Sequence, residues 1–190
     1  MNTQHTQKGF TLVETLVAIA ILMVAIAGPL TVANKALTAA LGSRNAMIAT
    51  YLAQDGMESI KNIKDNNASV TGTPWLKGLN YSSCTSKNNP CTTPDVPSYY
   101  SSGLENANVM QCDITSTCQL SVNAAINYYY PIVSGTPNGS YHASPFMRYF
   151  YFTPVGDGST ETIVTVIVQW TDGSIPNEIR LQELMTNTTR

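Results

Sequence analysis

The sequence has few charged residues, few histidines and no surplus of basic residues, and each deficit argues against a class of function. Charged residues make up 12% of the 190-residue chain, about half of the roughly 25% found in an average soluble protein, which argues against a charged disordered chain or a coiled coil. The formal net charge is −2, so no general attraction to nucleic acid is expected. There are only two histidines, one of them His5, which makes a histidine-dependent enzyme a poor candidate.

Cysteine is confined to one loop-rich region, which we place at residues 80–120. Its four members are Cys84, Cys91, Cys112 and Cys118. Four cysteines allow three disulfide connectivities, and we predict the one that pairs neighbours and closes two small loops. A zinc site is the alternative, but the close ligand spacing typical of zinc sites is absent and no histidine lies near. Disulfides persist in oxidising compartments, so this region is expected outside the cytoplasm.

Apolar residues are concentrated near the N-terminus. The stretch from Thr15 to Asn34 contains no charged residue, and about 20 helical residues cross the roughly 30 Å hydrocarbon core of a bilayer. A bilayer offers no water to backbone groups, so this stretch should be helical there. Gly28 and Pro29 lie inside it. Because proline removes one helix hydrogen bond and clashes with the preceding turn, we expect a kink or local melting at this point.

A second apolar pattern follows the uncharged run. Its members are Leu37, Leu41, Ile48, Leu52, Ile60 and Ile63. Most of these residues are three, four or seven positions apart, which is typical of one face of a helix. We therefore expect one continuous helix, with this face forming the core under the rest of the chain. Asn66-Asn67 and the Thr-Gly-Thr-Pro sequence at 71–74 are expected to end it.

The remaining residues predict a β-rich head. Ser, Thr, Asn, Gly and Pro dominate residues 66–147, which favours loops and short strands. Segments rich in aromatic and β-branched residues predict strands. These segments are Met147–Thr153, Glu161–Trp170 and Glu178–Thr186, with two further candidates at Leu120–Ile126 and Tyr128–Val133. Gly156-Asp157-Gly158 and Asp172-Gly173 supply the turns of a meander. The predicted fold class is α+β, a long N-terminal helix packed on a C-terminal antiparallel sheet.

The sequence Lys-Gly-Phe-Thr-Leu-Val-Glu at residues 8–14 stands directly before the apolar run. This combination resembles the type IV pilin superfamily, which includes major and minor pilins and the pseudopilins of type II secretion. Members share a short basic leader ending in glycine, then Phe-Thr-Leu-hydrophobe-Glu and an apolar helix. The resemblance is strong over residues 1–35. The helix around residues 53–60 is similar to the minor pilin and minor pseudopilin branches.

The resemblance implies a pilin-like fold and a processing route. A prepilin peptidase would cut between Gly9 and Phe10 on the cytoplasmic side and would methylate the new amine of Phe10. The chain would then divide into a leader (1–9), a transmembrane and assembly helix (10–35), an amphipathic helix of the head (36–65) and the β-rich head itself (66–190). The helix would place the chain in the bacterial inner membrane as a single-pass protein, with the head outside the cytoplasm.

Glu14 places a charged carboxylate at the start of the apolar segment. A carboxylate in a bilayer costs roughly 2.5–3.5 kcal/mol at a helix centre unless it is paired. In the family it pairs with the first-residue amine of a neighbouring subunit, so the resemblance implies a role for Glu14 in assembly. The alternative is a charge that lies near the membrane edge. The implied partners are the prepilin peptidase, other pilins or pseudopilins, and an inner-membrane assembly platform.

The function implied is that of a minor pilin or minor pseudopilin, a structural subunit of a type IV pilus or a type II secretion pseudopilus. The alternative is a membrane-anchored or secreted β-rich binding or enzymatic domain behind an ordinary signal sequence. We expect no enzyme, no cofactor, no metal and no nucleic-acid partner. His142 and Asp157 with nearby serines could form a catalytic triad, and Asp157, Ser159 and Glu161 could bind calcium. A Ser-rich loop and a Gly-Asp-Gly turn explain these residues more simply.

Overall fold

The computed structural model describes residues 9, 11–93, 109–123, 128–131 and 141–187. These residues fall into two compact units, one covering positions 1–44 and the other positions 45–190. The first unit is helical wherever it is described from residue 12 onward. The second contains the rest of that helix and all seven strands.

One α-helix, α1 (Leu12–Ser69), forms the N-terminal part of the chain. It ends between the two predicted stop signals. The helix is unbroken at Gly28 and Pro29, so the expected local melting at these residues is wrong for this structure. Proline removes only one of the many hydrogen bonds along a helix of this length. The Thr31 hydroxyl also donates a hydrogen bond to the Gly28 carbonyl oxygen (2.7 Å), which adds a local bond within this turn.

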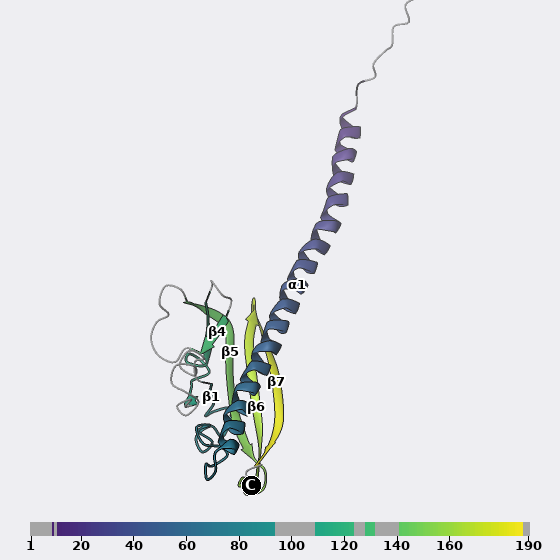
Figure 1. The fold of residues 1–190 in the computed structure, drawn as a ribbon. Coiled ribbons are helices and arrows are strands. Elements are labelled where there is room, and N and C mark those ends of the chain that lie inside the picture. The colour runs from purple at the N-terminus through teal and green to yellow at the C-terminus, as the bar shows by residue number, and fades with distance from the viewer. Residues whose placement is uncertain (1–8, 10, 94–108, 124–127, 132–140, 188–190) are drawn as a thin grey trace, which may run out of the picture. The chain divides into compact units, whose positions relative to one another are not determined.

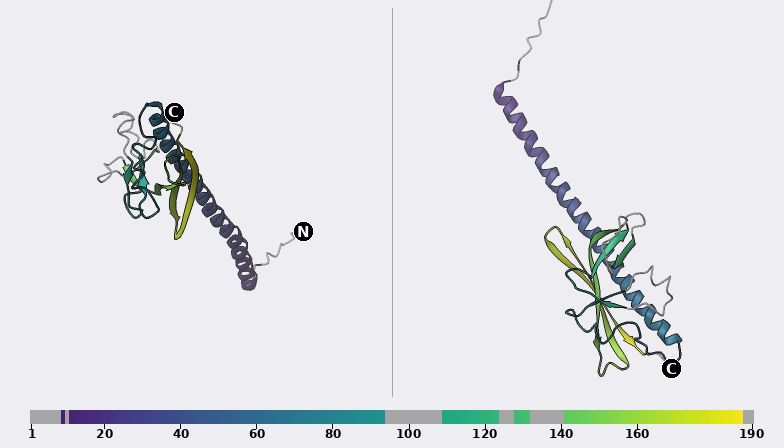
Figure 2. Two further views of the ribbon diagram at one scale, coloured as in Figure 1. Left: turned by 90° about the horizontal axis from the view of Figure 1, so that it is seen from below. Right: turned by 90° about the vertical axis from the view of Figure 1, so that its left-hand side faces the viewer.

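Within its described residues, the head contains one antiparallel sheet of seven strands. They are β1 (Cys91–Thr92), β2 (Met110–Gln111), β3 (Gln119–Asn123), β4 (Tyr128–Pro131), β5 (Tyr141–Pro154), β6 (Glu161–Asp172) and β7 (Ile175–Thr186). The predicted α+β fold class, a long N-terminal helix packed on a C-terminal antiparallel sheet, is confirmed. Figure 1 shows the later part of α1 running alongside the three longest strands, and Figure 2 shows the same arrangement from two other sides.

β5 is the central strand of the sheet and pairs with other strands along both of its edges. Along one edge it pairs with β6, which pairs in turn with β7, and this is the predicted meander. Along its other edge it pairs with β1 and β3. β5 begins at Tyr141, six residues before the predicted start at Met147. In the two weaker candidate strands, β3 ends at Asn123 and β4 at Pro131, and the later parts of both predictions lie outside the described residues.

The core of the head lies between α1 and one face of the sheet. The buried helix residues are Ala49, Leu52, Ala53, Gly56, Met57, Ile60 and Ile63. They pack in one apolar cluster with sheet residues that include Phe150, Val164 and Val166. The prediction that Leu37 and Leu41 belong to the core face is wrong, because these side chains are 62% and 51% exposed. Both lie in the first unit, whereas the buried turns begin at Ala49.

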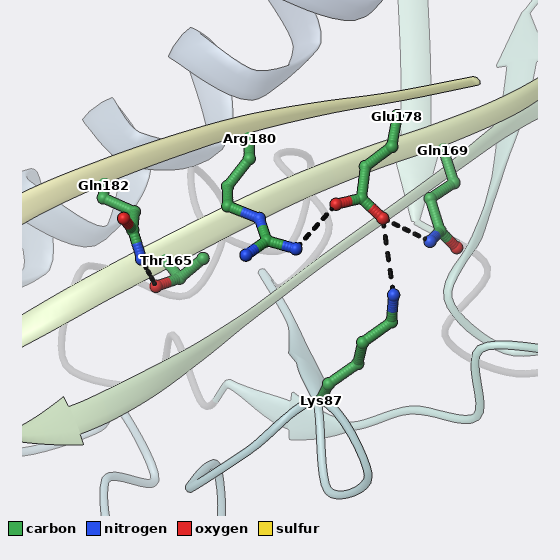
Figure 3. A network of polar contacts seen from close by, with 6 residues as sticks. All are labelled: Lys87, Thr165, Gln169, Glu178, Arg180 and Gln182. Atoms are coloured by element: carbon green, nitrogen blue, oxygen red, sulfur yellow. Dashed lines mark hydrogen bonds and ion pairs between the residues drawn. The ribbon is translucent and has the colours of Figure 1, made fainter.

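The opposite face of the sheet has a smaller apolar cluster and a polar network. Cys118, Tyr149 and Ile167 are buried together there. Beside them, the carboxylate of Glu178 on β7 accepts hydrogen bonds from side chains on three different segments (Figure 3). β6 is the sole strand partner of β7 within the described part of the chain. The exposed positions of β7 include Pro176, Glu178 and Arg180.

Gly158, in the turn between β5 and β6, gives a prediction of stability. Its φ is +74°, and an added Cβ would lie 2.6 Å from the Tyr81 hydroxyl oxygen and 2.9 Å from the Pro154 Cβ. Gly158→Ala is therefore expected to lower the free energy of unfolding by about 2–4 kcal/mol, from backbone strain together with steric overlap. Gly156→Ala is the matched control, because Gly156 has a φ of +62° but open space around it.

Denaturant unfolding of both variants measures the difference. The control is expected to lose only the strain contribution of about 1–2 kcal/mol. Equal losses in the two variants would show that the contacts of Gly158 with Tyr81 and Pro154 do not constrain this turn.

Candidate functional site

The start of α1 coincides with the motif at residues 8–14. Thr11 is the N-cap residue: its hydroxyl oxygen accepts a hydrogen bond from the Glu14 backbone N–H (3.3 Å). Its carbonyl oxygen accepts from the backbone N–H groups of Glu14 (3.1 Å) and Thr15 (3.2 Å). Thr-x-x-Glu is the sequence pattern of a capping box, in which threonine and glutamate satisfy the free N–H groups of a first helical turn. The motif thus encodes the beginning of the helix.

Glu14 lies in the first turn of α1 and is exposed. A carboxylate at this position is favoured by the partial positive charge of the helix N-terminus. Within the described residues, no ion pair or side-chain hydrogen bond reaches the Glu14 carboxylate. Its charge would therefore need a partner from another molecule if this turn entered a bilayer.

The peptide bond between residues 9 and 10 lies directly before this cap. Gly9 is exposed, and a Cβ built on it meets nothing within 4 Å. Glycine at this position is therefore not required by packing within the chain itself. Phe10 lies outside the described residues.

The first part of α1 has the properties of a membrane span. The helix is long and apolar enough to cross a bilayer, and none of its most apolar window is buried within the chain. The exposed large side chains include Leu16, Ile21 and Leu30. The hydroxyls of Thr15 and Thr31 donate to carbonyl oxygens three residues earlier, at 2.8 Å and 2.7 Å. These polar groups are satisfied without water, as an apolar solvent requires.

The cysteine region is tied to the sheet by two disulfides. Cys84 pairs with Cys91, and Cys112 pairs with Cys118. The Cys84 carbonyl oxygen accepts a hydrogen bond from the Phe152 N–H (2.7 Å), and the Cys118 carbonyl oxygen accepts from the Arg148 N–H (3.0 Å). Each small loop is therefore attached to β5 by a backbone hydrogen bond next to its disulfide.

The polar network in Figure 3 links the first of these loops to the sheet. Lys87, inside the Cys84–Cys91 loop, forms an ion pair with Glu178 (3.4 Å). Burial on its own would raise the pKa of Glu178, but donors on Gln169, Arg180 and Lys87 outweigh burial and hold this pKa below its ordinary value. All the carboxylate's partners belong to the chain, so the network has a structural role in the head.

The two residues considered for a catalytic triad lie far apart along β5. His142 lies near the start of β5, whereas Asp157 follows its end. The 12 steps from His142 to Pro154 span about 40 Å of extended chain, so no triad forms from these two residues. The Asp157 carboxylate accepts hydrogen bonds from the Ser159 N–H (3.0 Å) and hydroxyl (2.8 Å) in a turn. No cluster of three or more potential metal ligands occurs among the described residues.

The second disulfide gives a testable prediction. Replacing both Cys112 and Cys118 by serine should lower the free energy of unfolding by about 2–3 kcal/mol, because closure of a loop this short constrains the unfolded chain. The sheet strands β5–β7 should still form, since they pair with one another along most of their length. Chemical denaturation followed by circular dichroism measures both effects, with Ser116→Ala in the same loop as control.

Mass spectrometry of unreduced peptides from the exported protein tests the pairing itself. We expect peptides that join Cys84 to Cys91 and Cys112 to Cys118. A peptide that joins Cys84 to Cys118, or four cysteines that react with alkylating reagent, would contradict it.

Comparison with known families identifies the N-terminal site. Residues 4–28 match the family model described as the prokaryotic N-terminal methylation motif. No curated protein and no solved structure matches the chain. The match covers residues 4–9 of the predicted leader, the cap sequence at residues 11–14 and the first turns of α1. It confirms that the chain carries the prepilin motif typical of type IV pilin-like precursors.

Proposed function

We propose that this chain is a structural subunit, a minor pilin or minor pseudopilin, of a type IV pilus or a type II secretion pseudopilus. The methylation motif supports a pilin-type precursor that a prepilin peptidase processes and that assembles with other pilins. The observation that carries the proposal is the position of this motif. It coincides with the N-cap of a helix whose first 30 or so residues are exposed and mostly apolar, and none of them is buried against another described residue.

Three residues have specific roles in the proposal. The peptidase cuts between Gly9 and Phe10, and the new amine of Phe10 is methylated. Glu14 then stands four residues after that amine in the sequence, and its carboxylate pairs with the amine of a neighbouring subunit. This pairing removes two unsatisfied charges from an apolar environment at once.

The proposal also fixes the location of the two units. Before assembly, α1 anchors the chain in the bacterial inner membrane, and the head lies on the outer side, where its disulfides are stable. The exposed apolar surface of the helix is covered first by lipid and then by the helices of neighbouring subunits. An inner-membrane assembly platform would move the subunit between these two environments.

The N-terminus of the mature protein tests the proposal. The chain would be purified from the cell envelope, and its first residues sequenced by tandem mass spectrometry. A chain that begins with N-methylated Phe10 supports the proposal. A chain that begins at Met1, or after a cleavage between Ala33 and Ala40, would instead support a domain behind an ordinary signal sequence or anchor.

A further inference from the structure

Arg148, on β5, is a cation buried between α1 and the sheet. Its side chain is 3% exposed. One guanidinium nitrogen donates to the Leu52 carbonyl oxygen of α1 (3.2 Å) and to the Asp55 carboxylate (2.5 Å). The other terminal nitrogen donates to the Thr93 hydroxyl (2.9 Å). One side chain thus connects the helix, the central strand and the segment that follows β1.

The helix face beside this contact is apolar and buried. Small residues, Ala49, Ala53 and Gly56, form part of the buried helix face. A Cβ on Gly56 would lie 3.1 Å from the Arg148 Cδ and 3.2 Å from a Val166 methyl group. Apolar contacts are non-directional, but a close-packed face loses its fit when one element slides past the other, so packing already opposes an axial shift of the helix. A helix presents similar surfaces every turn, about 5.4 Å apart.

The bonds of Arg148 are directional and respond to such a displacement. If α1 moved by one turn, the guanidinium would lose Asp55 and the Leu52 carbonyl oxygen. A buried cation without its partners is strongly destabilising. The displaced state is therefore disfavoured by Arg148 even where the apolar contacts would allow it.

Other polar contacts between α1 and the sheet restrain the helix less. Lys61 and Glu183 form an ion pair (2.7 Å), but their side chains are 44% and 41% exposed, and exposed pairs contribute little. Near the start of the packed region, Asn45 donates to Asp172 (2.6 Å). Asp172 also accepts from the Trp170 and Asn177 side chains, so it keeps partners if Asn45 moves away.

We infer that Arg148 is a positioning residue that fixes the axial register of α1 on the head sheet. The inference stands on the geometry of the head alone. Its consequence for assembly rests on the proposed function. A filament subunit is moved by its helix, and the head follows that movement only if α1 does not slide along the head sheet. Arg148 is the buried, directional contact that adds most to this restraint.

A distance measurement across the packed region tests the inference on the full-length chain in detergent. Nitroxide labels on cysteines at Tyr51 and Leu184 are suitable, because these side chains are exposed and the chain has no free cysteine. Lys61 contacts Glu183, the neighbour of Leu184. Tyr51 lies ten residues, or about 15 Å, before Lys61 along the helix, so the label separation changes when α1 slides.

Pulsed electron spin resonance is expected to give one narrow distance distribution for the parent chain and for Lys61→Met, the control. Arg148→Met should broaden the distribution or shift it by about one helical turn, roughly 5 Å. Asp55→Asn, which changes an exposed carboxylate, should broaden it less. A folded Arg148→Met chain with the parent distribution would overturn the inference.

If Arg148→Met does not fold, the distance distribution of Asp55→Asn tests the inference instead. A broadened distribution supports the inference, and an unchanged one overturns it. Because no filament is measured, failure of the proposed assembly function would leave this result unaffected.

Discussion

Gly9→Leu is expected to abolish removal of the leader, so that the precursor accumulates uncut in the membrane. The structure makes this variant informative, because a Cβ at residue 9 would meet no atom of the chain within 4 Å. A larger side chain should therefore leave α1, its cap and the head unchanged. The expected loss of cleavage arises only in the peptidase, where the peptide must approach the enzyme closely and a residue without a side chain is favoured.

Gly28→Ala is the matched control for this experiment. Gly28 also has no neighbour within 4 Å of a built Cβ, but it lies inside the membrane helix and away from the bond that is cut. The control should be processed at the parent rate. Gel mobility and intact mass of the membrane-bound chain distinguish precursor from product. Normal processing of Gly9→Leu would show that recognition does not depend on the size of residue 9.

Glu14→Ala is expected to be inserted and cut normally but to enter filaments at least tenfold less than the parent chain. The hydrogen bonds of the first turn to Thr11 involve the Glu14 backbone N–H, which alanine retains, so the helix should still begin at residue 12. Insertion should be no harder, because the variant removes a charge from the apolar run. In the proposed filament the neighbouring amine loses its partner, a loss of about 1.5–3 kcal/mol for a charged hydrogen bond.

Glu58→Ala is the control for Glu14→Ala. Glu58 is an exposed carboxylate on the same helix, within the head. The amount of each variant in sheared filaments, relative to the amount in membranes, is the measurement. Parent-level incorporation of Glu14→Ala would show that the carboxylate is dispensable for assembly. Loss of insertion or cleavage in this variant would instead assign Glu14 to an earlier step.

The elements with a strong local pattern could be predicted from the sequence. The uncharged run and the second apolar pattern after it predict a single helix, and α1 is unbroken from Leu12 to Ser69. The two turn sequences located the meander of β5, β6 and β7 correctly. Both patterns are local, because helix periodicity and hairpin turns depend on residues that are close in the chain.

The contacts between these elements could not be predicted in the same way. The second apolar pattern predicts which face of the helix is buried but not which turns the sheet covers. The prediction that Leu37 and Leu41 belong to the core is wrong for this reason. The close approach at Gly56 depends on small residues that carry little hydrophobic signal. Arg148 lay inside a predicted strand, where a basic residue suggests an exposed position, and its burial depends on Asp55, which is 93 residues away.

At the N-terminus, the sequence identified the motif and the comparison confirmed it. The structure adds that the same residues begin the helix, since Thr11 is its N-cap. The spacing Thr-x-x-Glu could have revealed this, because it is a known capping pattern. The proposed roles of Gly9 and Glu14 are tested by the two variants above, and the proposed methylation of Phe10 is tested by sequencing the mature N-terminus.

Among the described strands, β7 has no partner on its outer edge, which matters for a chain that is proposed to polymerise. The outer edge of an edge strand presents unpaired N–H and C=O groups, onto which the strands of other molecules could add one after another. On β7 this edge carries a proline and charged side chains at Pro176, Glu178 and Arg180, which are the features that natural proteins use to block such growth. The head is thereby a poor template for amyloid-like stacking, and in the proposed subunit polymer growth would depend on the N-terminal helix, which the proposed cleavage controls.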